Sequence, residues 1–536
     1  MHVPDSFKNS YARFPLYPCN LVDTGYYHST LETYREQLED DTGGLFIGDS
    51  QVAHIDLPVW DAVLPGQITP ATPPVQPGAP DVLDKWHICD DTGLKDFLSD
   101  ESTLTAASPV YTGEVATRPD PKCRYIFPYP RHARAPLSMT RTMLGRLFSY
   151  YQIMPIYLDF LTTFGQGSRQ RDLRYSGFRG RTRLSLPPRQ DTVALDLGRS
   201  GRHIQMCYNL KSVACITPPK TTAKKDMQWS RRPVALYHHF DVVEGNALWV
   251  ITSGGRYFRD RLEDTVGLPG RAEDRDYSTL EAAFRSTFVV HALAAHWAKE
   301  GWPAYIQWLE DVVEESTCDA IYGARGELIE KKYTPDNIQS VQYYEDRTNE
   351  ATMILESNRD VLAALSKYYE DLLADTDFPL RQSCRDNIVD FARQLQDAVH
   401  DTHMQASRAR LVVRIAADRK ALVQSHLTSQ ATAFQHQASQ KMEFMTSIAQ
   451  RDAIMMRIIT FITLVYLPAT FVSTFFSTDV VKYQDQNDFG RSFYTSSYSK
   501  LALERWLQIT LPLTTVTLTA AWWFFSREKK RLMLPS

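Results

Sequence analysis

Hydrophobic and polar positions change their period along the chain. Residues His203–Val213 and Val234–Gly255 are rich in β-favouring side chains, and a Glu244-Gly245-Asn246 turn divides the second stretch. This pattern predicts three strands, of which the last two form a hairpin. Apolar residues then recur at helical spacing from Leu280 to Ala295, after a capping-box pattern at Ser278–Glu281. We therefore expect an α+β domain in which helices follow strands.

A very long helical segment comes next. No glycine occurs between Glu327 and Phe489, and no proline occurs between Leu380 and Leu467. Helices in globular proteins normally stop after about 8 to 20 residues, so this span predicts one exceptional helix from about residue 386 to 478. Such a helix needs other helices, from its own chain or from copies of it. The positions that would make these contacts are mostly three, four or seven apart: Leu395, Val399, Leu411, Ile415, Leu422, Phe434, Ala438, Met442, Met445 and Ala449.

Two uncharged segments of 21 residues, 458–478 and 506–526, lie near the C-terminal end. As helices each covers about 32 Å, which matches a hydrocarbon core of about 30 Å. Trp506 at one end and the aromatic run Trp522–Phe525 at the other are typical of interfacial belts. A buried soluble helix is the alternative for either segment alone. Two segments of equal length favour a transmembrane hairpin.

The charges around these segments predict their orientation. The connection 479–505 carries four acids and four bases, whereas the REKKR run of the tail carries four cations. Because Lys and Arg concentrate on the cytoplasmic side, both termini are expected there and the connection outside. The chain is thus expected to be an integral, multi-pass membrane protein with two spans.

One face of the first span is polar. Steps of three and four residues place three threonines in a single stripe, whose members are Met456, Ile459, Thr463, Leu467, Thr470 and Thr474. A polar stripe on a spanning helix is expected to face a bundle or an aqueous path. Pro468 removes the hydrogen bond to the Leu464 carbonyl and predicts a bend in mid-span. The span ends on Ser477-Thr478-Asp479.

The composition of the chain argues against several classes of function. A net charge of −4 gives no basic field for nucleic acid, and the basic run Arg171–Ser185 favours a solvated loop. Seven scattered cysteines without a CxxC pair predict free thiols in a reduced compartment rather than a zinc site. His238 and His239 are expected to point to opposite faces of a strand, one buried and one exposed. No catalytic motif occurs, so an enzyme is not expected and no cofactor is assigned.

These observations predict the order of domains along the chain. Seven prolines between Pro58 and Pro80 predict that residues 1–83 form an irregular arm with a Pro-rich linker. Residues 84–325 are expected to form the cytoplasmic α/β domain and residues 326–457 the helical stalk. The hairpin, 458–526, and the basic tail, 527–536, complete the predicted order.

The combination resembles a known family. The features that carry the resemblance are an α/β region, an unbroken helix that runs into a first span, the sequence Pro468-Ala469-Thr470-Phe471, a second span and a basic tail. With these features the chain resembles the CorA-like magnesium transporters, in their fungal CorA-like branch. The resemblance implies a homopentamer whose first spans line a pore with the stripe defined above. It also implies a Gly-Met-Asn signature at the outer mouth, where this chain has Ser477, Thr478 and Asp479.

Two functions remain open. One is a divalent-cation channel or transporter of the magnesium type, with a ring of Asp479 carboxylates as the metal-binding element of an altered mouth. The other is a transport-inactive, membrane-anchored interaction or scaffold protein that keeps the fold. Under the second, Asp479 is the first solvated residue after a span.

Overall fold

The computed structural model describes residues 3–40, 44–48, 54–63, 82–101, 103–104, 111–112, 116–166, 174–218, 224–322, 334–477 and 500–532. They form two compact units, Met1–His426 and Leu427–Ser536, with the helix α10 (Arg385–Ser477) contributing to both. Each unit is described by itself.

A sheet of seven strands forms the centre of the first unit. Its order is β2-β1-β5-β9-β8-β7-β6, and every neighbouring pair is antiparallel except β5 and β9, which are parallel. The bounds are β1 Leu57–Ala62, β2 Leu83–Ile88, β5 Cys123–Ile126, β6 Phe178–Arg183, β7 His203–Cys215, β8 Trp229–Asp241 and β9 Ala247–Ser253; β3 Thr103–Leu104 and β4 Tyr111–Thr112 pair separately.

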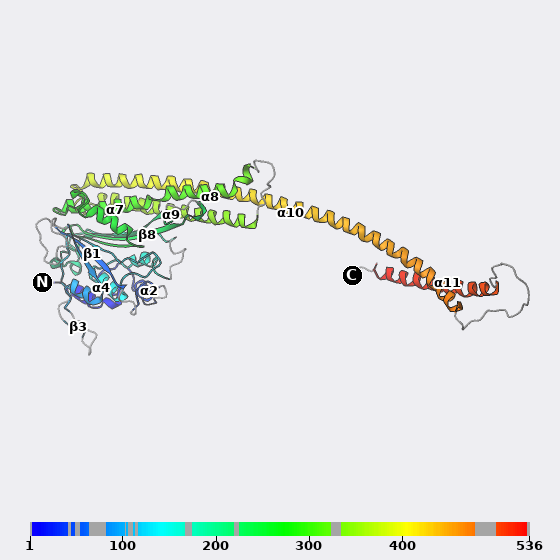
Figure 1. Ribbon diagram of the computed structural model, residues 1–536. Coiled ribbons are helices and arrows are strands. Elements are labelled where there is room, and N and C mark those ends of the chain that lie inside the picture. Colours follow the sequence, from blue (N-terminus) through cyan, green and yellow to red (C-terminus); the bar gives the residue numbers. More distant parts are fainter. Residues whose placement is uncertain are drawn as a thin grey trace, which may run out of the picture. The chain divides into compact units, whose positions relative to one another are not determined.

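Helices cover both faces of this sheet (Figure 1). On one face, side chains of α7 (Leu280–Lys299), α9 (Pro335–Ala374) and the first part of α10 share a core with the sheet. On the other face, α1 (Asp5–Ala12), α4 (Arg141–Tyr150) and α5 (Tyr157–Leu161) do so. The remaining helices are α2 His28–Glu39, α3 Asp91–Phe97, α6 Tyr257–Val266 and α8 Trp302–Tyr322, with short 3₁₀ turns at Phe14–Leu16, Gln190–Thr192, Leu195–Leu197, Lys224–Asp226 and Ala272–Arg275.

The burial pattern of β7 reflects these two layers. Ile204, Met206 and Tyr208 enter the core with α7 and α9, whereas Cys207, of opposite parity, enters the core with α4. Strand side chains alternate between faces, so a strand with both faces covered is apolar nearly throughout. The predicted hairpin is confirmed: β8 pairs with β9, and Gly245 in the turn has φ +73°, which a glycine adopts without strain.

Helix caps explain where the main helices begin. The hydroxyl of Thr279 accepts from the amide of Ala282 at 3.1 Å and begins α7, one residue later than the capping box predicted from Ser278. Thr334 and Asn337 form a reciprocal capping box at the start of α9, where Pro335 occupies the first turn.

Two expectations for the first unit are corrected. Residues 1–83 are not simply an irregular arm, because α1, α2 and β1 belong to the folded domain and Phe7 and Tyr11 are buried in its core; residues 64–81 of the Pro-rich stretch lie outside the described residues. Within the expected loop Arg171–Ser185, residues 178–183 form the edge strand β6.

The long helix α10 has 93 residues, close to the range expected from the sequence. Up to about Val423 it packs on α8 and α9 through small buried residues such as Ala406, Ala409 and Ala416. Ion pairs also connect this part of α10 to its neighbours. For example, Arg408 donates from Nε to Glu310 Oε1 at 2.9 Å and from Nη2 to Glu310 Oε2 at 2.5 Å. The predicted packing on helices of its own chain is therefore confirmed for this part. Among the predicted contact positions Leu395 is buried, whereas Leu411 and Leu422 are exposed, and the neighbouring Val412 and Val423 are buried in their place.

The second unit contains the rest of α10 and the helix α11 (Lys500–Leu532). Among the described residues, these two helices are long and apolar enough to cross a membrane. The indole of Trp506 donates to the hydroxyl of Ser473 at 3.0 Å, which joins the beginning of α11 to the end of α10.

Candidate functional site: a threonine stripe and a polar cavity

The stripe predicted from spacing lies on one exposed face of α10. Met456 and Leu467 are each 64 % exposed and Ile459 is 55 % exposed. The opposite face contains Pro468 and Val472, which are buried and follow each other at a spacing of four. Pro468 thus lies inside the helix on the covered side, turned away from the stripe; its predicted bend stays a prediction.

The three stripe threonines share one hydrogen-bonding arrangement. The hydroxyl of Thr463 donates to the Ile459 carbonyl at 2.7 Å, that of Thr470 to the Tyr466 carbonyl at 3.0 Å, and that of Thr474 to the Thr470 carbonyl at 2.9 Å. A hydroxyl has one donor and two acceptor lone pairs. Because the donor is used within the helix, each threonine presents only oxygen acceptors to the outside.

The stripe continues a series of exposed apolar residues further back on α10. Phe434, Met442 and Met445 are 56 %, 70 % and 66 % exposed. The steps from Phe434 to Thr474 average about 3.6 residues per turn, so these residues and the threonine stripe occupy one side of the helix. Between residues 441 and 457, nothing among the described residues of this chain covers that side.

The predicted mouth is described only in part. Ser477 is the last residue of α10, and Thr478 and Asp479 lie outside the described residues, as do the side chains of the basic tail after Arg527. The role of Asp479 as a metal-binding residue therefore stays a prediction.

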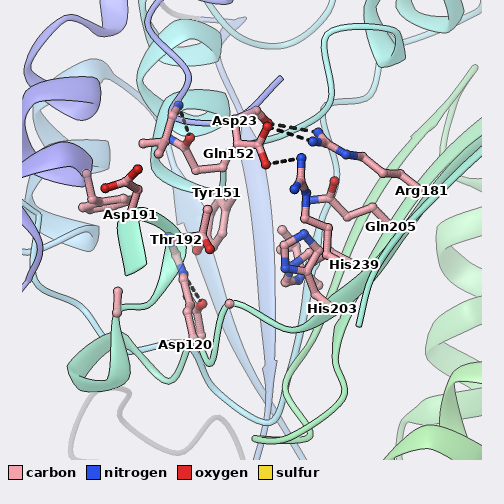
Figure 2. Close-up of a pocket in the computed structure, with 17 residues that line it drawn as sticks. Asp23, Asp120, Tyr151, Gln152, Arg181, Asp191, Thr192, His203, Gln205 and His239 are labelled. Carbon is pink, nitrogen blue, oxygen red and sulfur yellow. Dashed lines mark hydrogen bonds and ion pairs between the residues drawn. The ribbon is translucent and has the colours of Figure 1, made fainter. Parts of the chain in front are cut away.

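A second candidate region lies in the first unit, where the sequence predicted no site. A cavity opens on the α4 side of the sheet, and Figure 2 shows Asp23, Arg181, Gln205, His203 and His239 around it. Strand pairing explains their proximity. Arg181 of β6 is opposite Gln205 of β7, which is opposite His239 of β8, so the three form one row across the sheet.

Asp23 is the centre of an ion-pair cluster at this cavity. Arg181 donates from Nη1 to the Asp23 backbone carbonyl at 3.0 Å, and its Nη2 lies 2.9 Å from carboxylate oxygen Oδ1. Arg183 contacts the other oxygen, Oδ2, and Arg189 approaches Oδ1 at 3.6 Å. Three guanidinium groups thus surround one carboxylate that is 11 % exposed. Across the cavity, Arg199 forms a two-pronged pair with Asp120 at 2.6 and 3.1 Å.

Two histidines form the floor of the cavity. The rings of His203 and His239 have centroids 4.7 Å apart. Burial, and to a smaller extent the charge of Arg199, lowers the pKa of His239 to about 3. The pKa of His203 is well below its usual value, mainly because the ring is desolvated and to a smaller extent because of His239 and Arg183. Both imidazoles are therefore neutral near pH 7. Of the two neighbours expected to be one buried and one exposed, His238 is buried and His239 is half-buried, because the α4 layer covers part of that face of the sheet.

His238 and His291 lie in the core on the opposite face. His291 Nε2 and His238 Nδ1 are 3.2 Å apart, and the Tyr208 hydroxyl is 2.7 Å from His291 Nδ1. Burial lowers the pKa of His291 to about 3. His291 is thus a core histidine whose two ring nitrogens both have hydrogen-bond partners. Among the described residues, no group of three or more His, Cys, Asp or Glu side chains is placed to hold a metal ion.

The cavity residues come from at least eight segments of the chain, and this explains why the sequence did not predict the site. One signal was present: Arg179, Arg181 and Arg183 alternate, as expected for one face of a strand. Gly177 and Gly180 accompany them, and glycine is depleted in strands, which weakens this signal.

Comparisons with known proteins identify a family. A family model described as CorA-like transporters matches residues 9–321. Among solved structures, the CorA magnesium transporter from Methanocaldococcus jannaschii is similar at 12 % identity, over 76 % of this chain and 93 % of that chain, with a TM-score of 0.29. The full-length CmaX protein is similar at 14 % identity, over 60 % and 74 %, with a TM-score of 0.23. A search of curated proteins found no match.

The family match covers more than half of the chain and includes the sheet and the helices α7 and α8. The mixed α/β domain, the 93-residue helix and the two apolar helices that follow one another at the C-terminal end fit the same architecture and a membrane location. The chain is a member of the CorA-like transporter family.

Proposed function

We propose that this chain is the subunit of a homo-oligomeric, Mg²⁺-type divalent-cation channel or transporter, whose first spans line the path with the threonine stripe. Residues 458–478 and 506–526 would be the spans, with both termini in the cytoplasm. A pentamer is the assembly that the family resemblance implies. The same resemblance, to transporters of magnesium, makes Mg²⁺ the first cargo to test.

The hydrogen-bond direction of the threonines carries this proposal. Mg²⁺ dehydrates reluctantly and keeps several of its waters. Those waters direct their hydrogens outward, so a wall that accepts hydrogen bonds suits the hydrated ion. Thr463, Thr470 and Thr474 offer such acceptors because their own hydrogens are donated to the helix backbone. A stripe of this kind is unnecessary in a helix that only anchors a protein in lipid.

Cation flux into proteoliposomes tests the proposal. Replacing all three threonines by valine keeps their shape and removes the acceptors, and we expect Mg²⁺ flux to fall about tenfold or more, since each lost hydrogen bond costs about 1 kcal/mol. Thr519→Val is the matched control, because this exposed hydroxyl of α11 also donates within its own helix, to the Thr515 carbonyl at 2.8 Å. Equal flux in the triple variant and the wild type would contradict a role for the stripe.

The scaffold alternative has one observation in its favour. Where the family resemblance implies a Gly-Met-Asn signature, this chain has Ser477-Thr478-Asp479. Absence of Mg²⁺, Co²⁺ and Ni²⁺ flux in the wild-type proteoliposomes, together with intact oligomers, would support the scaffold and refute transport.

A further inference from the structure

The cavity at Asp23 contains polar side chains without protein partners. Gln205 is 4 % exposed, and no described residue forms a hydrogen bond with its side-chain amide. The rings of His203 and His239 also lack hydrogen-bond partners among the described residues. Buried polar groups are nearly always satisfied, by protein, water or ligand. The buried Gln205 amide lines the cavity, so its partner belongs inside the cavity, next to the two half-buried rings.

The charges around the cavity favour an anion. Arg181, Arg183 and Arg199 line the cavity together with Asp23, Asp120 and Asp191, so the charges of the lining balance. Arg189, which lies outside the lining and approaches Asp23 and Asp191, adds a fourth positive charge nearby. Arg183 contacts Asp23 through Nη2, and its Nε and Nη1 have no partner among the described residues. Arginine presents its N–H groups in a fork that matches oxyanions. The carboxylates of Asp23 and Asp120 are already paired with guanidinium groups, and among the described residues no group of three or more His, Cys, Asp or Glu side chains is placed to hold a metal ion.

The size of the cavity restricts the anion. Its volume is about 70 Å³, and one water needs about 10 to 15 Å³ by this measure, so it holds roughly five water-sized groups. A phosphate group has five non-hydrogen atoms. The donors also converge from two directions, guanidinium groups from β6 and the Gln205 amide from the sheet floor, an arrangement that suits a tetrahedral more than a planar ligand.

We propose that this cavity is a binding site for a phosphate group, held by the guanidinium groups of Arg181 and Arg183 and by the side-chain amide of Gln205. Such a site goes beyond ion conduction, because it lies at the sheet of the first unit and would bind an anion rather than the transported cation. It gives the transporter domain a means of responding to phosphate or to a phosphorylated metabolite.

Calorimetric titration of the detergent-solubilised full-length chain with inorganic phosphate tests this site. We expect saturable binding with one phosphate per chain. Arg183→Gln and Gln205→Leu should each weaken binding about tenfold or more, since a hydrogen bond to a charged group contributes about 1.5 kcal/mol or more. Arg179→Gln is the matched control, because Arg179 belongs to the same strand with the same parity but does not line the cavity. Melting without phosphate verifies that each variant is folded.

Two further ligands show whether the bound phosphate is free or part of a larger molecule, and whether the site prefers phosphate to other anions. If adenosine monophosphate binds more tightly than inorganic phosphate, with the same dependence on Arg183 and Gln205, the natural ligand is a phosphomonoester. If inorganic phosphate binds more tightly, the ligand is free phosphate. Either result supports the site. Succinate binding as tightly as phosphate would overturn the assignment to phosphate. No binding by the wild type, or equal binding by the Arg183→Gln and Arg179→Gln variants, would overturn the site itself.

Discussion

At the scale of single residues, the histidines are distinguished by what covers them. His238 stacks on Trp249 with a centroid distance of 3.9 Å and an interplanar angle of 9°, and its Nε2 is buried without a hydrogen-bond partner among the described residues. Burial, followed by the charges of His291 and His239, lowers the pKa of His238 well below 6.5. The unfolded chain therefore binds a proton that the folded chain does not, once the pH falls below about 6.5.

This linkage predicts acid sensitivity. The contribution of His238 to stability is present above about pH 6.5 and is lost as the pH falls toward its folded-state pKa. His238→Phe keeps the ring on Trp249 and removes the proton-binding site. We expect the slope of the unfolding free energy between about pH 6 and 4.5 to decrease by about 1.4 kcal/mol per pH unit, which corresponds to one proton. Denaturant titrations monitored by tryptophan fluorescence measure this slope.

The exposed His403 provides the control for that measurement. His403→Gln should leave the slope unchanged. A His238→Phe slope equal to that of the wild type would mean that His238 is already protonated in the folded chain, contrary to the burial argument.

At the scale of elements, α10 combines two surfaces that the sequence presents in one pattern. Its first part packs on α8 and α9, whereas Met442 and Met445 have no cover from the described residues of this chain. Exposed apolar residues in a helical row are typical of an interface. Copies of the same helix are the partners that the proposed homo-oligomer supplies.

Met442→Glu tests this surface. In an oligomer the new carboxylates would be close to one another and desolvated, so we expect the solution mass to shift from oligomer toward protomer. Light scattering coupled to size-exclusion chromatography measures the mass. Gln440→Glu introduces the same group on the opposite side of the helix and should leave the mass unchanged. Identical masses for wild type and Met442→Glu would show that this side of α10 is not an interface.

Much of the fold could be predicted at this scale. β7, β8, β9 and α7 have clear periods, and the missing glycines and prolines predicted α10 almost to its ends. The strand β6 was missed because its arginines and glycine lack β-favouring character. The helix α1 was missed because the prolines after Pro58 directed the interpretation of the whole N-terminal region. The cavity could not be predicted, since tertiary packing alone brings Asp23 to Arg181.

At the scale of the whole molecule, the outer mouth decides between transport and scaffold. In the proposed pentamer, Asp479 would form a ring of carboxylates, and like charges at short distance favour bound cations or shared protons. The family membership shows the architecture, and the ring is a property of the assembly rather than of one chain.

Substitutions at Asp479 test the ring. Asp479→Lys replaces the proposed negative ring by a positive one, and we expect Mg²⁺ flux into proteoliposomes to fall at least about a hundredfold, as several kcal/mol of attraction become repulsion. Asp479→Asn introduces the amide that the family resemblance implies at this position and should retain flux. Unchanged flux in Asp479→Lys would exclude the ring as a part of the path.

The uncovered stretch of α10 has a consequence for the stability of the protein. A helix segment of about 30 residues with apolar side chains in water is marginal without partners. If copies of the chain supply them, order in this stretch obeys mass action and depends on the concentration of subunits. Dilution would then loosen this stretch of the helix while the sheet, which is complete within one chain, keeps its structure. The amount of the protein in the cell would thus influence whether the helix between its sheet domain and its membrane part is ordered.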